Sequence, residues 1–213
     1  MSDILKTDVG RALRQEFFGL EYPRHKLIFH DDFLGRSLDA IWLGAGTGSA
    51  VVVDGETNGI VRLATGGGLN NYYVLDWNLI RTFSIANRLQ SEWRMRLGQT
   101  VDIAVEIRLY FDGDNRVGFF LNTVTDNKWH TICRSLGANT LFTTTSVLDT
   151  NFHTFRISTT PTAVDFYIDG MKTNTITTDI PTQNLEPYFL VYDNDTVAKN
   201  IDIDYFTATQ RRT

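Results

Sequence analysis

Apolar and polar residues alternate with a period of two along most of this chain, which is typical of β-strands. From Leu27 onward, short alternating runs are separated by clusters of Gly, Asn, Asp, Thr or Pro, the residues that form turns. The runs, about a dozen in number, are LIFHDDF, SAVVVDG, GIVRLAT, YYVLDW, SEWRMRL, DIAVEIRLYF, VGFFLN, KWHTICR, FHTFRIS, VDFYIDG, PYFLVYD and NIDIDYFTAT. No helical pattern lies between them, so we predict an all-β fold over residues 26–213, a two-sheet antiparallel jelly-roll sandwich.

Residues 1–25 follow a different pattern. Asp8 is placed to cap a short helix in which Val9, Leu13 and Phe17 recur at helical spacing. We therefore expect a short N-terminal helical arm that serves in anchoring or oligomerisation. Its apolar stripe suits packing on the chain's own sandwich and docking on a neighbouring subunit equally, so both arrangements stay open.

The alternation also predicts which side chains face away from the core. In the strand 101–111 the outward set is Asp102, Ala104, Glu106, Arg108 and Tyr110, and the strand 91–97 repeats this with Glu92, Arg94 and Arg96. Asn122 takes the same position at the end of 117–122. We expect these side chains to form one continuous band of carboxylates, guanidinium groups and aromatic rings.

Such a band offers flat rings to sugar faces and polar groups to sugar hydroxyls. The residues expected to bind a glycan are Tyr72, Tyr73, Trp77, Arg94, Arg96, Glu106, Arg108, Tyr110 and Asn122. The alternative for the aromatic residues is a place in the sandwich rim or in an interface with another subunit. The alternative for the charged residues is a solvated sheet face with cross-strand ion pairs.

Composition and charge exclude several classes of partner. The formal net charge is -5 and no run of Lys or Arg stands out, so nucleic acid is not expected as a ligand. Cys133 is the single cysteine, which excludes an internal disulfide and a multi-cysteine zinc site. The first residues lack the apolar core of a signal peptide, and no run is long enough to span a bilayer. We expect synthesis in the cytoplasm and no membrane partner.

Four segments in order, DDFLGRSLDAIWLG, TGGGLNNYYVLDW, NFHTFRIS followed by VDFYIDG, and IDIDYFTAT, resemble the concanavalin A-like lectin/glucanase superfamily. This superfamily includes laminarinase-type glycoside hydrolases and laminin-G-like domains. The resemblance covers roughly residues 27 to 210 and implies a concanavalin A-like jelly roll. More narrowly, the chain resembles virion proteins of tailed bacteriophages that carry this domain.

Retaining glucanases of the superfamily carry their carboxylates on one strand as Glu-x-Asp-x-Glu, so that all of them point into the cleft. The nearest match here runs from Asp102 to Glu106, with Asp in place of the first Glu and Ala104 in place of the central Asp. Residues four apart on a strand lie about 13 Å apart at Cα, whereas a retaining pair brings its carboxyl groups to about 5 Å. Because the motif is not intact, we assign no catalytic residue and expect a protein that is not an enzyme.

The narrower resemblance implies a bacteriophage virion structural or decoration protein, capsid- or tail-associated, that displays a lectin-like jelly roll. It would be made in the host cytoplasm, lie in the virion, contact other virion proteins, form a homo-oligomer with a trimer favoured, and bind a host-surface glycan. The alternative is a carbohydrate-active enzyme, either a polysaccharide lyase or a glycoside hydrolase, or a plain carbohydrate-binding module. A lyase would place a Tyr or His base beside cationic groups, for which Arg94, Arg96, Arg108, Tyr110 and His130 are the candidates.

Members of this superfamily often tie the first strand to the last through a structural calcium ion. The matching positions are Asp32 and Asp204, and the alternative is an ordinary turn carboxylate at each. No other cofactor is expected.

Overall fold

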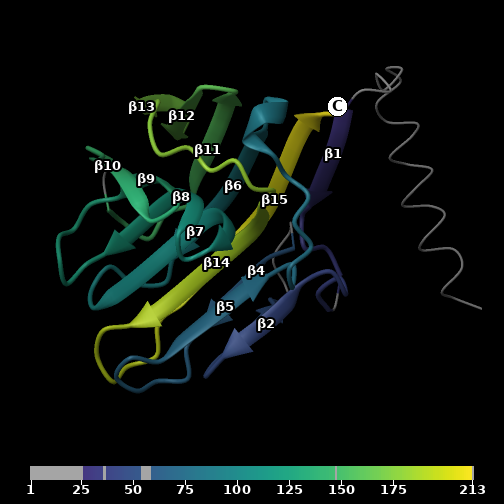
Figure 1. Ribbon diagram of the computed structural model, residues 1–213. Coiled ribbons are helices and arrows are strands. Elements are labelled where there is room, and N and C mark those ends of the chain that lie inside the picture. The colour runs from purple at the N-terminus through teal and green to yellow at the C-terminus, as the bar shows by residue number, and fades with distance from the viewer. Residues whose placement is uncertain (1–25, 36, 54–58, 147, 213) are drawn as a thin grey trace, which may run out of the picture.

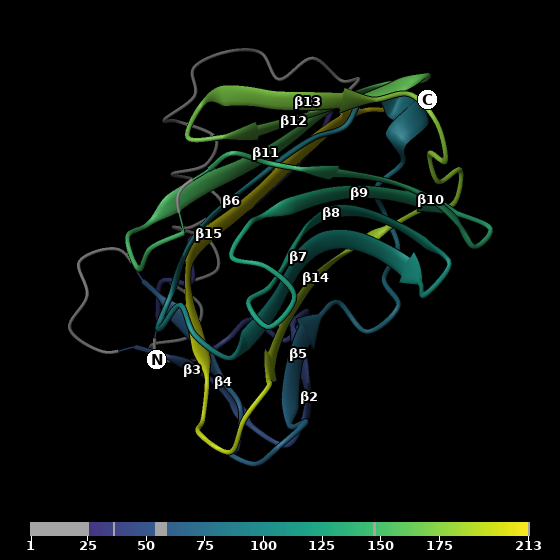
Figure 2. The same ribbon diagram turned by 90° about the vertical axis from the view of Figure 1, so that its left-hand side faces the viewer.

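The computed structural model describes residues 26–35, 37–53, 59–146 and 148–212. Within these ranges the chain forms two antiparallel β-sheets packed face to face, and the one helical element is the single 3-10 turn η1 (Ile85–Asn87). Figure 1 and Figure 2 show the two layers from perpendicular directions. The predicted arm, with Val9, Leu13 and Phe17, lies outside the described residues. No helix of the described part is long and apolar enough to cross a membrane.

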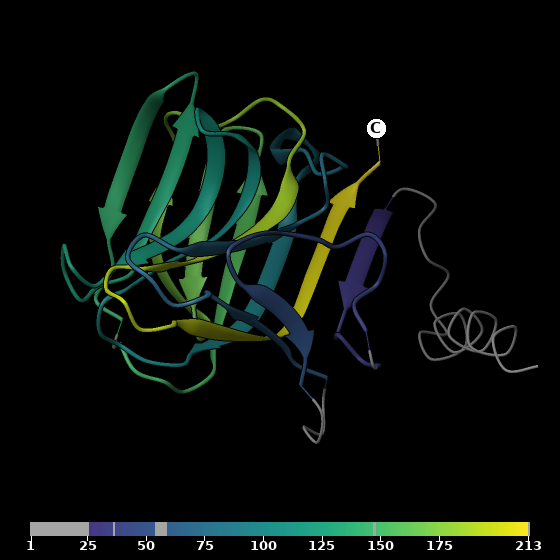
Figure 3. The same ribbon diagram turned by 90° about the horizontal axis from the view of Figure 1, so that it is seen from below.

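The larger sheet has eight strands in the order β13-β12-β11-β6-β15-β4-β3, and β1 also pairs with β15. Its strands are β1 (Lys26–Asp31), β3 (Ser49–Val52), β4 (Val61–Ala64), β6 (Gln90–Leu97), β11 (His153–Thr160), β12 (Ala163–Ile168), β13 (Met171–Ile176) and β15 (Asn200–Arg211). The yellow strand β15 lies directly beside the purple strand β1 in Figure 3, so the two ends of the described chain meet in this sheet.

The second sheet has seven strands in the order β10-β9-β8-β7-β14-β5-β2. Its strands are β2 (Leu43–Gly46), β5 (Tyr72–Asp76), β7 (Ile103–Asp112), β8 (Asn115–Asn122), β9 (His130–Ser135), β10 (Ala138–Thr143) and β14 (Glu186–Asp193). In Figure 2, β9, β8, β7 and β14 curve side by side as one layer across from β11, β6 and β15. The all-β jelly-roll prediction is confirmed.

The core lies between the sheets and follows the predicted alternation. Trp93 and Met95 of β6 and Val105 and Ile107 of β7 are at most 1% exposed, while the residues between them are partly exposed. Phe206 of β15 lies at the centre of an aromatic cluster, 5.7 Å from the ring of Trp93. Burying these large rings supplies most of the hydrophobic stabilisation of a sandwich.

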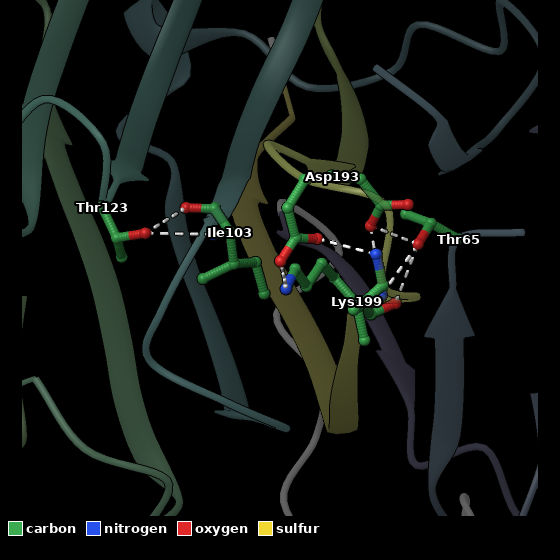
Figure 4. Close-up of polar contacts among 7 residues, drawn as sticks. Thr65, Ile103, Thr123, Asp193 and Lys199 are labelled. Atoms are coloured by element: carbon green, nitrogen blue, oxygen red, sulfur yellow. Dashed lines mark hydrogen bonds and ion pairs between the residues drawn. The ribbon is translucent and has the colours of Figure 1, made fainter. Parts of the chain in front are cut away.

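A buried polar cluster ties the connection between β14 and β15 to the end of β4 (Figure 4). The backbone N–H of Lys199 donates to Thr65 Oγ1 at 2.8 Å and to Asp193 Oδ1 at 3.1 Å, and Thr65 Oγ1 donates to the same carboxylate oxygen. Thr65, Asp193 and Lys199 are each at most 4% exposed. β14 belongs to the seven-stranded sheet, whereas β4 and β15 belong to the eight-stranded sheet, so the cluster connects the two sheets. We call it the Asp193 latch.

Candidate functional site

The outer face of the seven-stranded sheet carries a groove of about 210 Å³ over its three neighbouring strands β7, β8 and β9 and the edge strand β10. We call it the β7–β9 groove. It is lined by Glu106, Arg108, Arg116, Phe120, Ile132, Arg134, Asn139 and Leu141. The positions on β7, β8 and β9 alternate with buried residues, so the period of two that builds the core also builds this part of the groove floor, whereas Asn139 and Leu141 lie on the exposed edge strand β10.

The strand register places the basic residues of the groove in two neighbouring rows. Arg116 on β8 pairs with Arg134 on β9 and with Tyr110 on β7. Gly118 lies opposite Arg108, and a Cβ atom added there would approach Arg108 Cβ and the Ile107 carbonyl oxygen to 2.4 Å. Only glycine therefore fits beside Arg108, and the floor of the groove stays low at this position.

Arg108 lies at the centre of the site and is only 6% exposed. Its guanidinium forms an ion pair with Glu106 Oε2. Its Cζ atom lies 4.8 Å from the ring centroid of Tyr110 and 4.3 Å from that of Tyr188, and the two rings lie 4.6 Å apart. These contacts hold the guanidinium in one orientation, with the aromatic pair on one side and the acid on the other.

Arg116 and Arg134 extend the positive charge away from Arg108. Arg134 Nη2 lies 3.0 Å from the exposed carboxylate of Asp114, whereas no carboxylate of the described ranges pairs with Arg116. Burial and then repulsion from Arg108 and Arg134 lower the pKa of Arg116 below its usual value, although the attraction of Glu106 offsets part of this effect. The Nε atoms of Arg108, Arg116 and Arg134 are all buried and donate to no acceptor among the residues described.

A second carboxylate lies on the same sheet face but is buried. Glu186 pairs with Tyr110 in the register and is 1% exposed. Burial raises its pKa, and the neighbouring Asp76 carboxylate raises it further. Its Oε2 accepts the backbone N–H of Leu79 at 2.8 Å. Glu106, with its side chain 26% exposed, is therefore the carboxylate that the groove presents to a ligand.

The two histidines of interest make structural contacts. His130 hydrogen-bonds Asp126 at 2.9 Å and stacks on Phe120 with a centroid separation of 4.8 Å, which places its ring beside the groove. His153 lies on the other sheet between two aspartates, at 2.6 Å from Asp169 and 2.9 Å from Asp149.

Of the predicted glycan-binding residues, Glu106, Arg108, Tyr110 and Asn122 share the outer face of the seven-stranded sheet. Tyr72 is exposed on the same face at β5 but does not line the groove, because β14 lies between β5 and β7.

Two aromatic residues depart from the prediction. Tyr73 points inward and packs on the core, and Trp77 is 2% exposed in the aromatic cluster. The expectation that they face a glycan is wrong, because alternation along β5 directs the Tyr73 ring between the sheets and Trp77, which directly follows β5, is buried in the aromatic cluster.

Arg94 and Arg96 also depart from the prediction, because β6 belongs to the eight-stranded sheet and its outer face lies on the opposite side of the sandwich. Arg94 pairs there with Asp204, and Arg96 pairs with Asp202 at 2.8 Å. The expected continuous band is therefore two separate polar faces.

The expected calcium ligands do not form a group. Within the described ranges, no three His, Cys, Asp or Glu side chains gather where they could hold a metal ion. Asp204 is ion-paired to Arg94, whose charge would repel a cation, and Asp32 Oδ1 accepts the backbone N–H of Leu34 at 3.4 Å. Calcium binding at Asp32 and Asp204 stays an untested prediction, and nothing below depends on it.

Sequence reasoning missed three residues of the site, Arg116, Arg134 and Tyr188. Arg116 begins the outward alternation of β8, which continues with Gly118 and Phe120, but the prediction of a strand over 117–122 leaves Arg116 out, whereas β8 starts at Asn115. The start of β7 also differs, because Asp102 precedes the strand and has a positive φ of 53°. The face of β7 therefore reads Ala104, Glu106, Arg108, Tyr110, and the match from Asp102 to Glu106 does not lie on one strand.

Comparison with known proteins identifies the fold. No family model and no curated protein matches the chain. Among solved structures, a protein of unknown function from Shewanella oneidensis superposes with a TM-score of 0.66 at 13% identity, covering 94% of each chain. A mixed linkage glucan GH16 protein from Bacteroides ovatus gives 0.65 at 14% identity, covering 84% of this chain and 98% of its own. A β-glucanase from Bacillus licheniformis gives 0.62 at 13% identity, covering 87% and 98%.

The chain therefore has the concanavalin A-like jelly roll of the family 16 glucanases, and at these identities the likeness shows the fold alone. Two expectations change. The glycoside hydrolases among the structural neighbours contradict the expectation, drawn from a broken strand motif, that the chain is not an enzyme. The virion assignment finds no support in these comparisons, and the trimer, the virion partners and the localisation stay predictions.

Proposed function

We propose that this chain is a carbohydrate-active enzyme that cleaves a polysaccharide lying in the β7–β9 groove. The observation that carries the proposal is the groove itself, which places one accessible carboxylate, Glu106, beside a buried guanidinium and an aromatic pair on a central strand of the sheet. The glucan hydrolases that share this sandwich support the same assignment.

Two reactions that break glycosidic bonds, hydrolysis and elimination, can be tested in this groove. Hydrolysis uses two carboxyl groups, and here Glu106 is accessible while Glu186 is buried under the backbone of Leu79. Elimination uses a base beside a cation, and here Tyr110 lies beside Arg108. Each route uses a residue of β7, Glu106 for hydrolysis and Tyr110 for elimination. Substitutions at these two residues therefore test both routes.

The test is a panel of neutral and acidic polysaccharides with two readouts, new reducing ends and the ultraviolet absorbance of an unsaturated sugar product. Positioned acid–base groups contribute roughly a hundredfold or more to rate. If cleavage is hydrolysis, we expect Glu106→Gln to lower its rate by about that factor, and if cleavage is elimination, we expect Tyr110→Phe to do so. Glu92→Gln is the matched control, because Glu92 lies on the outer face of the other sheet, where it accepts the Tyr205 hydroxyl at 2.6 Å.

Cleavage that is lost in the variant of its own route, Glu106→Gln for hydrolysis or Tyr110→Phe for elimination, and kept in Glu92→Gln supports the proposal. Cleavage that survives in both groove variants moves the site elsewhere and contradicts it. A panel on which the wild-type chain releases no product by either readout also contradicts it.

A further inference from the structure

We propose that the polysaccharide accepted by the β7–β9 groove is acidic, and that its carboxylate or sulfate groups bind to Arg108, Arg116 and Arg134. The inference rests on the proposed function, since it names the substrate class of the same groove. It follows from three observations: surplus positive charge, unpartnered donors, and an apolar wall beside them.

The charge in the groove is unbalanced. Three neighbouring strands each contribute one arginine, and the acids that pair with them are Glu106 and Asp114. Asp114 is 63% exposed at its side chain, so water weakens its attraction for Arg134. This leaves one positive charge in surplus on a chain whose formal net charge is -5. The positive potential is thus a local property of the groove.

The three arginines also have hydrogen-bond donors without an acceptor. The Nε atoms of Arg108, Arg116 and Arg134 are buried without an acceptor in the described part of the chain. A buried donor left without an acceptor is costly, and an oxyanion can accept from several donors at once. The planar guanidinium fork matches carboxylate and sulfate groups, so an acidic sugar that binds to the partly exposed side chains of Arg116 and Arg134 would relieve the repulsion between the arginines and compensate the cost of their buried Nε atoms.

The groove also has an apolar wall. Phe120, Ile132 and Leu141 line it beside the arginines, since Ile132 and Leu141 share a row with Arg108, and half of Leu141 is exposed. Carbohydrate rings present C–H faces that pack on such surfaces. A sugar ring on this wall would direct a charged substituent toward Arg116, whereas a neutral sugar would leave the guanidinium donors unpaired.

The experiment uses polysaccharide pairs that differ only in charge, namely a polyuronate against its carboxyl-reduced form and dextran sulfate against dextran, together with a neutral mixed-linkage glucan. Binding is measured by affinity electrophoresis and calorimetry at two salt concentrations, and cleavage is measured in parallel. We expect the acidic member of at least one pair to bind tenfold or more tightly than its neutral counterpart. The two pairs separate a carboxylate from a sulfate.

Three variants assign the effect to the groove. Arg116→Gln should weaken binding of the acidic polysaccharide by about tenfold or more, the usual worth of a hydrogen bond to a charged group. Arg116→Lys keeps the charge and should recover part of the loss. Arg156→Gln is the matched control, because it removes the same charge on the outer face of the other sheet. Arg156 also has a buried Nε atom without an acceptor among the described residues, and it packs on Tyr167.

The inference is supported if the chain binds an acidic polysaccharide preferentially and if this binding weakens in Arg116→Gln but not in Arg156→Gln. If such binding is seen without cleavage, only the proposed enzymatic function fails. Cleavage of a neutral glucan with no preference for its charged counterpart overturns the inference and leaves the proposed function standing. Equal losses in Arg116→Gln and Arg156→Gln overturn it as well, because they show attraction to the whole surface. If no polysaccharide is bound or cleaved, both proposals fail.

Discussion

The Asp193 latch makes a quantitative prediction about stability. Thr65→Val keeps the shape of the side chain but removes the hydroxyl that donates to the Asp193 carboxylate. The backbone N–H of Lys199 keeps its bond to Asp193 Oδ1 at 3.1 Å, so that donor is not orphaned. The carboxylate is left with one donor in place of two, because its Oδ2 is already buried without a partner among the described residues.

A hydrogen bond from a neutral donor to a charged group contributes about 1.5–3 kcal/mol. We therefore expect Thr65→Val to lower the free energy of unfolding by about 2 kcal/mol, which for a chain of this size corresponds to a fall in Tm of about 4–8 °C. Urea titration at fixed pH measures the first quantity and scanning calorimetry the second.

Thr65→Ser is the matched control, because it keeps the hydroxyl and removes one methyl group, at a cost of about 0.8 kcal/mol. If Thr65→Val destabilises the protein no more than Thr65→Ser does, the hydroxyl contributes nothing beyond packing, and the reasoning about the latch is refuted.

Three further predictions concern single side chains. Burial alone lowers the pKa of His153, but its hydrogen bonds to two aspartates outweigh burial and raise the pKa above its ordinary 6.5. The stability that protonated His153 contributes is therefore complete below the unfolded pKa and is lost as the pH rises through the higher folded pKa. His153→Gln should flatten this loss in urea titrations run from acidic to alkaline pH, and an unchanged profile would exclude the role. Burial raises the pKa of the Cys133 thiol well above its ordinary value, so a thiol reagent should modify it only after unfolding, and rapid modification of the native protein would show that the strand opens. Gly118→Ala should cost about 1–3 kcal/mol through overpacking against the Ile107 carbonyl, whereas Gly113→Ala meets nothing within 4 Å and is the control in the same thermal unfolding assay.

The sequence predicted the interior of the sandwich well, because inward residues of central strands are apolar and alternate. It missed β2, β10 and β13, and all three are edge strands. Every residue of β2 and every residue but one of β10 is exposed, so neither strand has a buried apolar face that alternation could reveal. An edge strand is held by one ladder of backbone hydrogen bonds, which leaves little trace in side-chain pattern.

The candidate site shows a second limit. Alternation predicted that Arg94 and Arg108 both point away from the core, and they do, but it cannot tell to which sheet a strand belongs. Pairing between strands distant in sequence decides that assignment. Arg134 entered the site for the same reason, since only the register of β8 with β9 places it beside Arg116.

The position of β15 has a consequence for synthesis of the protein. This strand pairs with β6, β4 and β1, yet its residues, 200–211, follow all three in the chain. While the ribosome is still translating the preceding part, those strands have emerged without the neighbour that joins them, and their open edges can pair with other nascent chains. The eight-stranded sheet can therefore be completed only after residue 211 leaves the exit tunnel, and until then folding depends on whatever shields those edges.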